Sequence, residues 1–210
     1  MSTFLENQNW RYATKKFDAT KKITTEDLNF LKEAIRLSSS SYGLQPYKVF
    51  VIDNPELRAK IQPVAWGQSQ IIDASHLLVF ANVTSISEEE IDSYIKNIST
   101  TRSLPLDTIV GLGDFMKSKI LTLSEETKNI WSAKQVYLAM GNLLNAAAEK
   151  QIDVTPMEGF APEQVNEILG LNELGLNATL IATIGYRHTE DDTQHYKKVR
   201  KSHEELFITL

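Results

Sequence analysis

Residues 126–151, ETKNIWSAKQVYLAMGNLLNAAAEKQ, form the longest helical pattern in the chain, and the rest must pack around it. Apolar residues repeat at helical spacing along two adjacent stripes. The first stripe contains Ile130, Ala133, Tyr137, Met140, Leu144 and Ala147, and the second contains Val136, Ala139, Leu143 and Ala146. A helix that is apolar over so wide an arc is buried on more than one side. Its second face meets either the core of its own chain or a second subunit.

Segments with the length and composition of β-strands lie on both sides of this helix. They are Tyr47–Ile52, His76–Val83, Ile152–Thr155 and Ala178–Tyr186, with Leu206–Leu210 as a candidate terminal strand. The run 76–83 is almost continuously apolar, which is typical of a strand covered on both faces. Helices and strands mix without regular βαβ spacing. The sequence therefore predicts an α+β fold with a mixed sheet.

Capping and turn residues predict the shorter helices. Thr24 and Asp27 can form a capping box, and this helix ends in the polar cluster 38–41. Pro55 and Pro162 stand where a helix can begin, and Gly170 stands where the second of these helices would end. Residues 87–97 indicate an acidic, solvated helix and residues 99–105 a loop, with a helix resuming after position 107.

Length and composition narrow the classes of protein. The 210 residues are 42% hydrophobic, enough for one substantial core, and we expect a single domain over residues 1–210. The net charge of -5, with no basic run, argues against nucleic-acid and membrane-surface binding. The absence of cysteine excludes disulfides and thiolate chemistry. The first ten residues lack the pattern of a signal peptide, so we expect a cytoplasmic protein.

Common catalytic and nucleotide-binding motifs do not occur. There is no Walker A pattern, no GxSxG elbow and no GxGxxG after a strand. The four histidines lack zinc-type spacing, so no metal site is predicted. His76, beside Asp73, is interpreted as a hydrogen-bonded structural residue, with a catalytic base as the alternative. Without a glycine loop, a bound phosphate would depend mainly on side chains.

Six segments carry a family resemblance. They are WRYATKKFD (10–18), SSSYGLQP (39–46), DASH (73–76), AKQVY (133–137), PMEGF (156–160) and KVR (198–200). Alone, the basic groups indicate a solvated face and residues 157–160 a strand-to-helix turn. The ordered set resembles the bacterial oxygen-insensitive NAD(P)H nitroreductases and related flavin reductases. The resemblance implies an α+β sandwich, with a mixed sheet flanked by helices and a long central helix at a homodimer interface that binds FMN.

The resemblance also implies roles for single residues. Arg11, Lys198 and Arg200 would hold the FMN phosphate, and guanidinium groups suit phosphate because they bind it bidentately. Lys15 and Glu158 would be catalytic. Lys15 would stabilise negative charge at the pyrimidine end of the flavin, and the Glu158–Gly159 backbone would approach N5, the hydride acceptor. The remaining implied cofactor contacts are Tyr12, Ala13, Gln45, Gly67, Gln68, Pro156 and Met157, with Ser39, Ser40 and Ser41 supplied by the partner subunit.

The substrate side is less regular. Tyr42, Gln70, Phe115 and Met116 fall where relatives line the substrate cavity. Gly67 replaces an asparagine that contacts the flavin, which leaves Gln68 or Gln70 to take over that contact. Tyr12, Ala13, Ser39 and Tyr42 also depart from the common pattern.

The implied activity is ping-pong, two-electron reduction by NADH or NADPH. Small-molecule electron acceptors would be nitroaromatics, quinones, flavins or pteridines. One alternative keeps the fold and FMN but performs dehalogenation or flavin fragmentation. Another is a non-catalytic FMN sensor or interaction protein.

Overall fold

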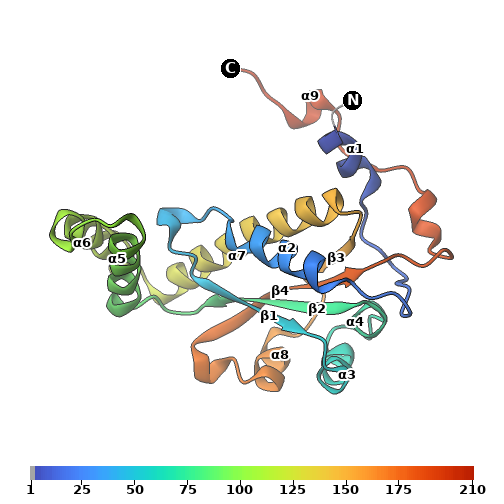
Figure 1. The fold of residues 1–210 in the computed structure, drawn as a ribbon, viewed down its shortest axis with the longest axis horizontal. Coiled ribbons are helices and arrows are strands. Elements are labelled where there is room, and N and C mark those ends of the chain that lie inside the picture. Colours follow the sequence, from blue (N-terminus) through green and yellow to red (C-terminus); the bar gives the residue numbers. More distant parts are fainter. Residues whose placement is uncertain (1–2) are drawn as a thin grey trace.

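A four-stranded sheet with the order β1-β2-β4-β3 forms the centre of the computed structural model, which describes residues 3–210 (Figure 1). The strands are β1 (Tyr47–Ile52), β2 (His76–Val83), β3 (Asp153–Met157) and β4 (Leu176–Gly185). The α+β class is confirmed, but every strand pair within residues 3–210 is antiparallel, so the expected mixed sheet is wrong. Sequence pattern identifies a strand, whereas its direction depends on where each connection returns to the sheet.

The predicted strand bounds agree well in the first half of the chain. Strands β1 and β2 match their predicted ranges, while β3 runs on to Met157 and β4 begins at Leu176. The predicted terminal strand 206–210 is wrong. Helix α9 (His203–Leu206) occupies its start, and residues 207–210 pair with no strand of the described chain. The local reason is a capping box, in which Ser202 and Glu205 favour a helical turn.

Helices α2 (Thr25–Arg36) and α7 (Glu125–Glu149) cover one face of the sheet. Successive strand residues point to opposite faces, so Leu78 and Phe80 of β2 share a core cluster with Val136 and Leu143 of α7. Thr24 caps α2 as predicted, because its hydroxyl accepts a hydrogen bond from the backbone of Asp27. The same hydroxyl donates to the Asp27 carboxylate, which differs from the backbone contact of a full capping box.

Three helices cover the other face of the sheet. They are α3 (Pro55–Val64), α4 (Gln70–Asp73) and α8 (Pro162–Leu169). Leu77 and Val79, which alternate along β2 with Leu78 and Phe80, are buried in this second cluster. Because both faces are covered, β2 is apolar along nearly its whole length. The two prolines open α3 and α8 as predicted, and Gly170 ends α8 with a left-handed backbone.

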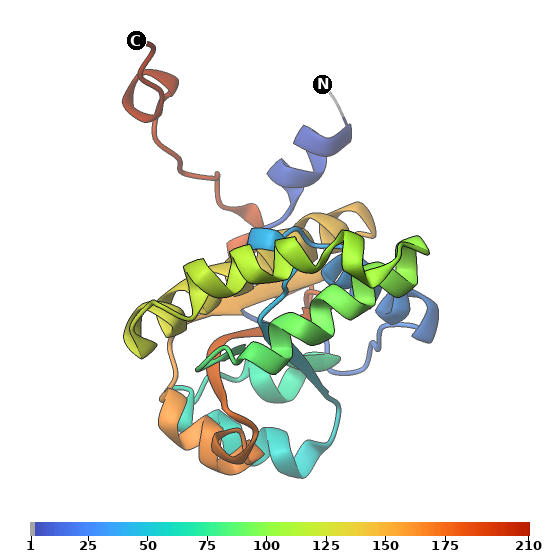
Figure 2. The ribbon, with the colours of Figure 1, turned by 90° about the vertical axis from the view of Figure 1, so that its left-hand side faces the viewer.

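A lobe made of α5 (Glu88–Arg102) and α6 (Val110–Ile120) stands beside the sheet (Figures 1 and 2). Helix α5 continues through the first part of the predicted loop 99–105. It is not solvated all round, because Ile91, Ile95 and Ile98 form a third core cluster with α6. These isoleucines recur every three or four residues and therefore lie on one face. The acidic residues between them masked this face in the sequence.

The two apolar stripes of α7 have roles that the sequence left open. The second stripe, Val136, Ala139, Leu143 and Ala146, is buried in the core of its own chain, so its use as a subunit interface is wrong. The first stripe is divided. Met140 and Ala147 are buried, whereas Ile130 and Tyr137 are each 49% exposed, and neighbouring Leu138 is 48% exposed. The sheet covers one side of α7 and leaves an apolar outer face.

Both ends of the chain project from the body on the same side (Figures 1 and 2). They contain α1 (Thr3–Trp10) and the segment that carries α9. Short 3-10 helices complete the fold: η1 (Ser41–Gly43), η2 (Leu106–Thr108), η3 (Asn172–Leu174) and η4 (Asp192–His195). Within residues 3–210, no helix has both the length and the apolar character needed to cross a bilayer.

Candidate active site

A basic cavity of about 310 Å³ lies where the two ends of the chain meet. Arg11, Lys198 and Arg200 line it, and none of these three forms a salt bridge with another described residue. Burial lowers the pKa of Arg11, and the charge of Arg200 lowers it further. Burial also lowers the pKa of Lys198, with added repulsion from both arginines. Three converging cations without a carboxylate suit a multivalent anion, and their donor chemistry fits a phosphate.

Lys198 also joins the two ends of the chain. Its Nζ donates to the carbonyl of Gln8 and, at 2.5 Å, to the carbonyl of Arg11. These carbonyls lie at the end of α1. The residues that build the cavity are therefore brought together across almost the whole sequence.

Buried Asp191 organises the loop that presents Lys15. Its Oδ2 accepts hydrogen bonds from the backbone of Lys15 at 2.8 Å, the backbone of Lys16 at 3.1 Å and the Tyr12 hydroxyl at 3.0 Å. Burial would raise the pKa of Asp191, but these bonds and one from Thr193 outweigh it and keep the pKa below its ordinary value. The loop is thus fixed through its backbone, while the Lys15 side chain stays exposed. Asp191 was not predicted from the sequence, because it lies in an acidic run that resembles a solvated turn.

A partly buried ion pair anchors the same N-terminal motif to the sheet. Arg187 Nη2 donates to Asp153 Oδ1 at 2.6 Å, and the guanidinium carbon lies 4.1 Å from the Trp10 ring centre and 4.5 Å from that of Tyr12. Thr14 adds a hydroxyl bond to Asp153 at 3.2 Å. The sequence motif around Arg11 is therefore held by charge pairing and cation–π contacts, which the sequence analysis did not predict.

The segment 156–160 begins with the last two residues of β3 and passes close to α7 and α3. Glu158 is exposed, and its Oε1 accepts a hydrogen bond from the Tyr137 hydroxyl at 2.7 Å. This bond raises the pKa of Tyr137 to about 12, with a smaller contribution from burial. Pro156, Met157 and Glu158 line a cavity of about 410 Å³ beside the outer face of α7.

Gly159 lies against a neighbour that was not predicted from the sequence. A Cβ at this position would lie 2.5 Å from Cζ3 of Trp66, so any residue other than glycine would make the indole ring shift. Trp66 is 79% exposed and has a left-handed backbone. Gln68 Nε2 donates to the Gly159 carbonyl at 3.0 Å. The turn after α3 therefore holds Gly159 from two sides.

The two other candidates near this turn differ in accessibility. Gly67 has a left-handed backbone and open space around its Cα. Gln70 is almost fully buried, which places little of its side chain at the surface. Of the two glutamines considered as replacements for the missing asparagine contact, Gln68 lies against the 158–160 segment.

Helices α7 and α2 hold the serine turn, which is the segment 39–45. The backbone of Ser41 donates to Gln135 Oε1 at 2.8 Å, and Ser40 Oγ accepts from the backbone of Gln45 at 2.9 Å. The side-chain amide of Gln45 donates to the carbonyl of Arg36 at 2.8 Å and so caps the end of α2. Ser39 remains exposed. Gln45 thus holds the turn through its side-chain amide nitrogen, and its contact with the cofactor stays a prediction.

The serine turn and Glu158 contact opposite sides of α7. Ser41 bonds to Gln135, whereas Glu158 bonds to Tyr137. Helical residues that are two positions apart differ by about 200° around the axis. One chain therefore does not bring these two predicted parts of the site together across α7.

Aromatic side chains gather where the lobe meets the body. The Tyr42 ring centre lies 6.4 Å from Phe115 in an edge-on arrangement and 6.4 Å from Trp131. Phe115 is half exposed, but Met116 is fully buried between α5 and α6. Consecutive helical residues point about 100° apart, so the predicted substrate role of Met116 is corrected to a core role.

The family model for the nitroreductase family matches residues 9–186. The chain belongs to the nitroreductase family. Three proteins illustrate the similarity. YfkO of Bacillus subtilis, whose name gives NAD(P)H nitroreductase as an unproven activity, is 36% identical over 87% of this chain and 88% of its own. The major NAD(P)H-flavin oxidoreductase of Aliivibrio fischeri is 32% identical over 98% of this chain and 96% of its own.

A protein of Exiguobacterium sibiricum, described as a candidate nitroreductase and solved in complex with FMN, shares the fold. Its TM-score is 0.86 at 19% identity, covering 100% of this chain and 98% of that protein. The predicted nitroreductase-like fold and family are confirmed. Together with the names of the relatives, this membership also confirms the prediction of an NAD(P)H-dependent oxidoreductase.

Proposed function

We propose that this nitroreductase-family chain is a homodimeric FMN enzyme that uses NADH or NADPH to reduce small planar acceptors. The observation that carries the proposal is the cation cluster of Arg11, Lys198 and Arg200. Its members repel one another in a partly buried cavity, so a bound phosphate would offset a cost that the fold already bears. The FMN in the Exiguobacterium relative and the NAD(P)H in the relatives' names support the same assignment.

Each part of the chain has a separate task in this proposal. The cation cluster would bind the phosphate, and Asp191 would fix the loop so that Lys15 faces the flavin ring. The 158–159 backbone, held by Gln68 and Trp66, would define the position of the ring edge. When bound, FMN supplies the two-electron chemistry, by taking a hydride from the nicotinamide and passing reducing equivalents to the acceptor. The protein supplies placement, charge and exclusion of water.

A second subunit would complete the site. The serine turn lies across α7 from Glu158, so it can reach a flavin beside Glu158 only from another chain. Ile130, Tyr137 and Leu138 leave an apolar outer face on α7, and such contiguous surfaces mark association sites. The two projecting chain ends also carry exposed apolar residues, Phe207 and Ile208 among them. A symmetric dimer would cover these surfaces.

Donor and acceptor would use one cavity in turn. Tyr42 and Phe115 lie at its predicted acceptor side, and their aromatic surfaces suit nitroaromatics, quinones, flavins or pteridines. Varying both substrates should give parallel double-reciprocal lines, because the nicotinamide product leaves before the acceptor binds. Intersecting lines would show a ternary complex and would exclude the single shared cavity.

One experiment tests the proposal as a whole. We expect the purified protein to be yellow, to contain about one FMN per chain, and to bleach anaerobically with NADH or NADPH. A protein that stays colourless after incubation with FMN would refute FMN binding. A yellow protein that does not bleach would instead support a non-catalytic FMN protein.

A further inference from the structure

The turn that carries Tyr42 has an unusual backbone. Tyr42 and Gln45 have φ values of 59° and 48°, and Gly43 between them has a φ of 78°. The left-handed region is unfavourable for residues with a Cβ, and such residues keep this conformation only when their surroundings hold them there. Something near this turn must therefore restrain it.

Tyr94 of α5 makes the direct contact. Its hydroxyl donates to the carbonyl of Tyr42 at 2.7 Å. A Cβ on Gly43 would lie 2.4 Å from the same hydroxyl oxygen, so the absence of a side chain at Gly43 creates the space for it. The tyrosine and the glycine thus form one interlocking contact between α5 and the turn.

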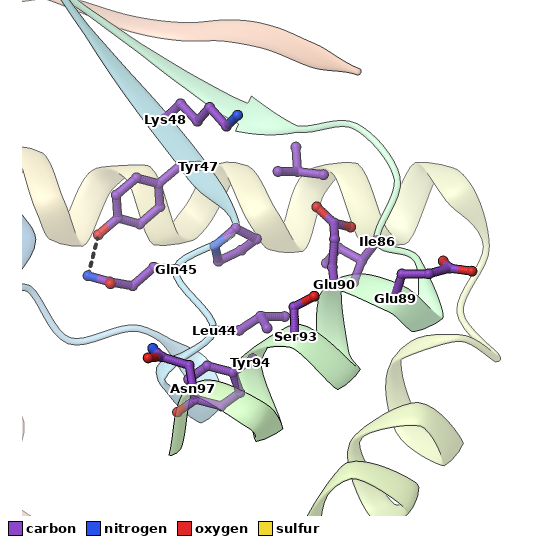
Figure 3. A pocket seen from close by; sticks show the side chains of 12 residues that line it. Leu44, Gln45, Tyr47, Lys48, Ile86, Glu89, Glu90, Ser93, Tyr94 and Asn97 are labelled. Carbon is purple, nitrogen blue, oxygen red and sulfur yellow. Dashed lines mark hydrogen bonds between the residues drawn. The ribbon is translucent and has the colours of Figure 1, made fainter. Parts of the chain in front are cut away.

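Apolar packing also joins the turn to the lobe, because Leu44 and Tyr94 both pack against the α5–α6 core cluster. Figure 3 shows Leu44, Tyr94 and Asn97 close together at one end of a cavity of about 440 Å³. Tyr94→Phe keeps the ring in this packing and removes only its hydrogen bond to the Tyr42 carbonyl. Removing the hydroxyl should therefore alter the position of Tyr42 more than the stability of the core.

The Tyr42 ring lies among aromatic residues that we assign to the acceptor side of the proposed site. It meets Phe115 of α6 and Trp131 of α7, with both pairs of ring centres 6.4 Å apart. Lys117 ties α6 to α5 through Glu88 and Asp92, each at 2.7 Å. The hydrogen bond from α5 consequently fixes Tyr42 relative to Phe115 on the same lobe.

We propose that Tyr94 is a positioning residue that holds Tyr42 against Phe115 and thereby limits the size of acceptor that the enzyme reduces. Compact, single-ring acceptors fit beside the closed aromatic pair, whereas acceptors with several fused rings require Tyr42 to move. This inference rests on the proposed function. It adds a determinant of acceptor size that lies outside the cavity itself.

The test compares Tyr94→Phe with the unmodified holoenzyme, using p-benzoquinone and a tricyclic anthraquinone sulfonate as acceptors. We expect the ratio of kcat/KM for the tricyclic to the single-ring acceptor to rise about 2- to 13-fold, the equivalent of one net hydrogen bond. The Kd for FMN should not change. Ser93→Ala is the matched control, because it removes another α5 hydroxyl that lines the same cavity and does not bond to the turn.

A double-mutant cycle checks that the contact itself is responsible. Gly43→Ala displaces the Tyr94 hydroxyl and should shift the acceptor ratio in the same direction. Gly43→Ala combined with Tyr94→Phe should shift the ratio less than the sum of the single effects, because both changes remove one contact. Additive effects, or an unchanged ratio in Tyr94→Phe, would overturn the proposal.

Hydrogen exchange of the apoprotein separates this proposal from the proposed function. Tyr94→Phe should speed exchange at the amides of Gly43 and Leu44, which bond within the turn to Ser40 and Ser41. Faster exchange with an unchanged acceptor ratio would make the contact merely structural. A protein whose amides exchange as expected but that never binds FMN or oxidises NAD(P)H would refute the proposed function. The proposed effect of Tyr94 on acceptor size would then also be refuted.

Discussion

Replacing Arg200 with alanine should weaken FMN binding without weakening the apoprotein. Arg200 lines the basic cavity, and its charge lowers the pKa of both Arg11 and Lys198. Its removal relieves repulsion in the apoprotein, so the apoprotein Tm should stay constant or rise. One charge-assisted contact to phosphate is worth about 1.5–3 kcal/mol. The Kd for FMN should therefore increase about 10- to 150-fold.

Titration of the apoprotein with FMN, followed by flavin fluorescence, measures this change. Lys201→Ala is the matched control, because it removes a neighbouring exposed cation that does not line the cavity. Riboflavin provides a second control, since it lacks the phosphate and should bind Arg200→Ala and the unmodified protein equally. Equal loss of FMN affinity in Arg200→Ala and Lys201→Ala would show that the effect comes only from the change in net charge. An unchanged Kd in Arg200→Ala would refute the phosphate assignment.

Three further changes test the subunit interface, the Tyr137 bond and the partly buried ion pair. Leu138→Glu should yield a folded monomer with reduced FMN content, measured by light scattering and absorbance, and a dimer with full FMN would contradict the α7 interface. The Tyr137 bond raises the pKa of that hydroxyl from near 10 to about 12, so its stabilisation is complete below pH 10 and lost as the pH rises toward 12. Tyr137→Phe should remove this pH dependence in denaturant titrations, and identical profiles would exclude the bond. Asp153→Ala leaves the partly buried Arg187 charge without its carboxylate and should lower the free energy of unfolding by about 1.5–3 kcal/mol, the value of a hydrogen bond to a charged group. A loss below about 1 kcal/mol would mean that water replaces the carboxylate.

Local sequence patterns predicted much of the fold, because interactions between residues close in the sequence set where helices and strands begin and end. The bounds of β1 and β2 follow from apolar runs between turn residues, and the starts of α3 and α8 follow from Pro55 and Pro162. Residues 206–210 show the limit of this approach. An apolar run suggested a strand, but a strand also needs a partner, and none lies beside this segment in the described chain.

The candidate site divides in the same way. The ordered motifs identified Arg11, Lys198 and Arg200, and the structure brings these three to one cavity. The residues that hold the motifs in place were missed, namely Asp191, the Asp153–Arg187 pair and Trp66. Their importance comes from partners more than 30 residues away, and single-sequence patterns contain no signal for such contacts.

The sequence by itself determined the family through the order of its motifs along the chain. It determined the α+β class and the positions of most helices and strands because hydrophobic periodicity and capping residues act over short distances. Tertiary structure alone decided that the sheet is antiparallel, and that Val136 and Leu143 face the core while Tyr137 and Leu138 face outward. It also decided that Met116 is buried beside exposed Phe115. The physical reason is that a pattern shows how much apolar surface a helix has, whereas only packing determines which part of that surface the sheet covers.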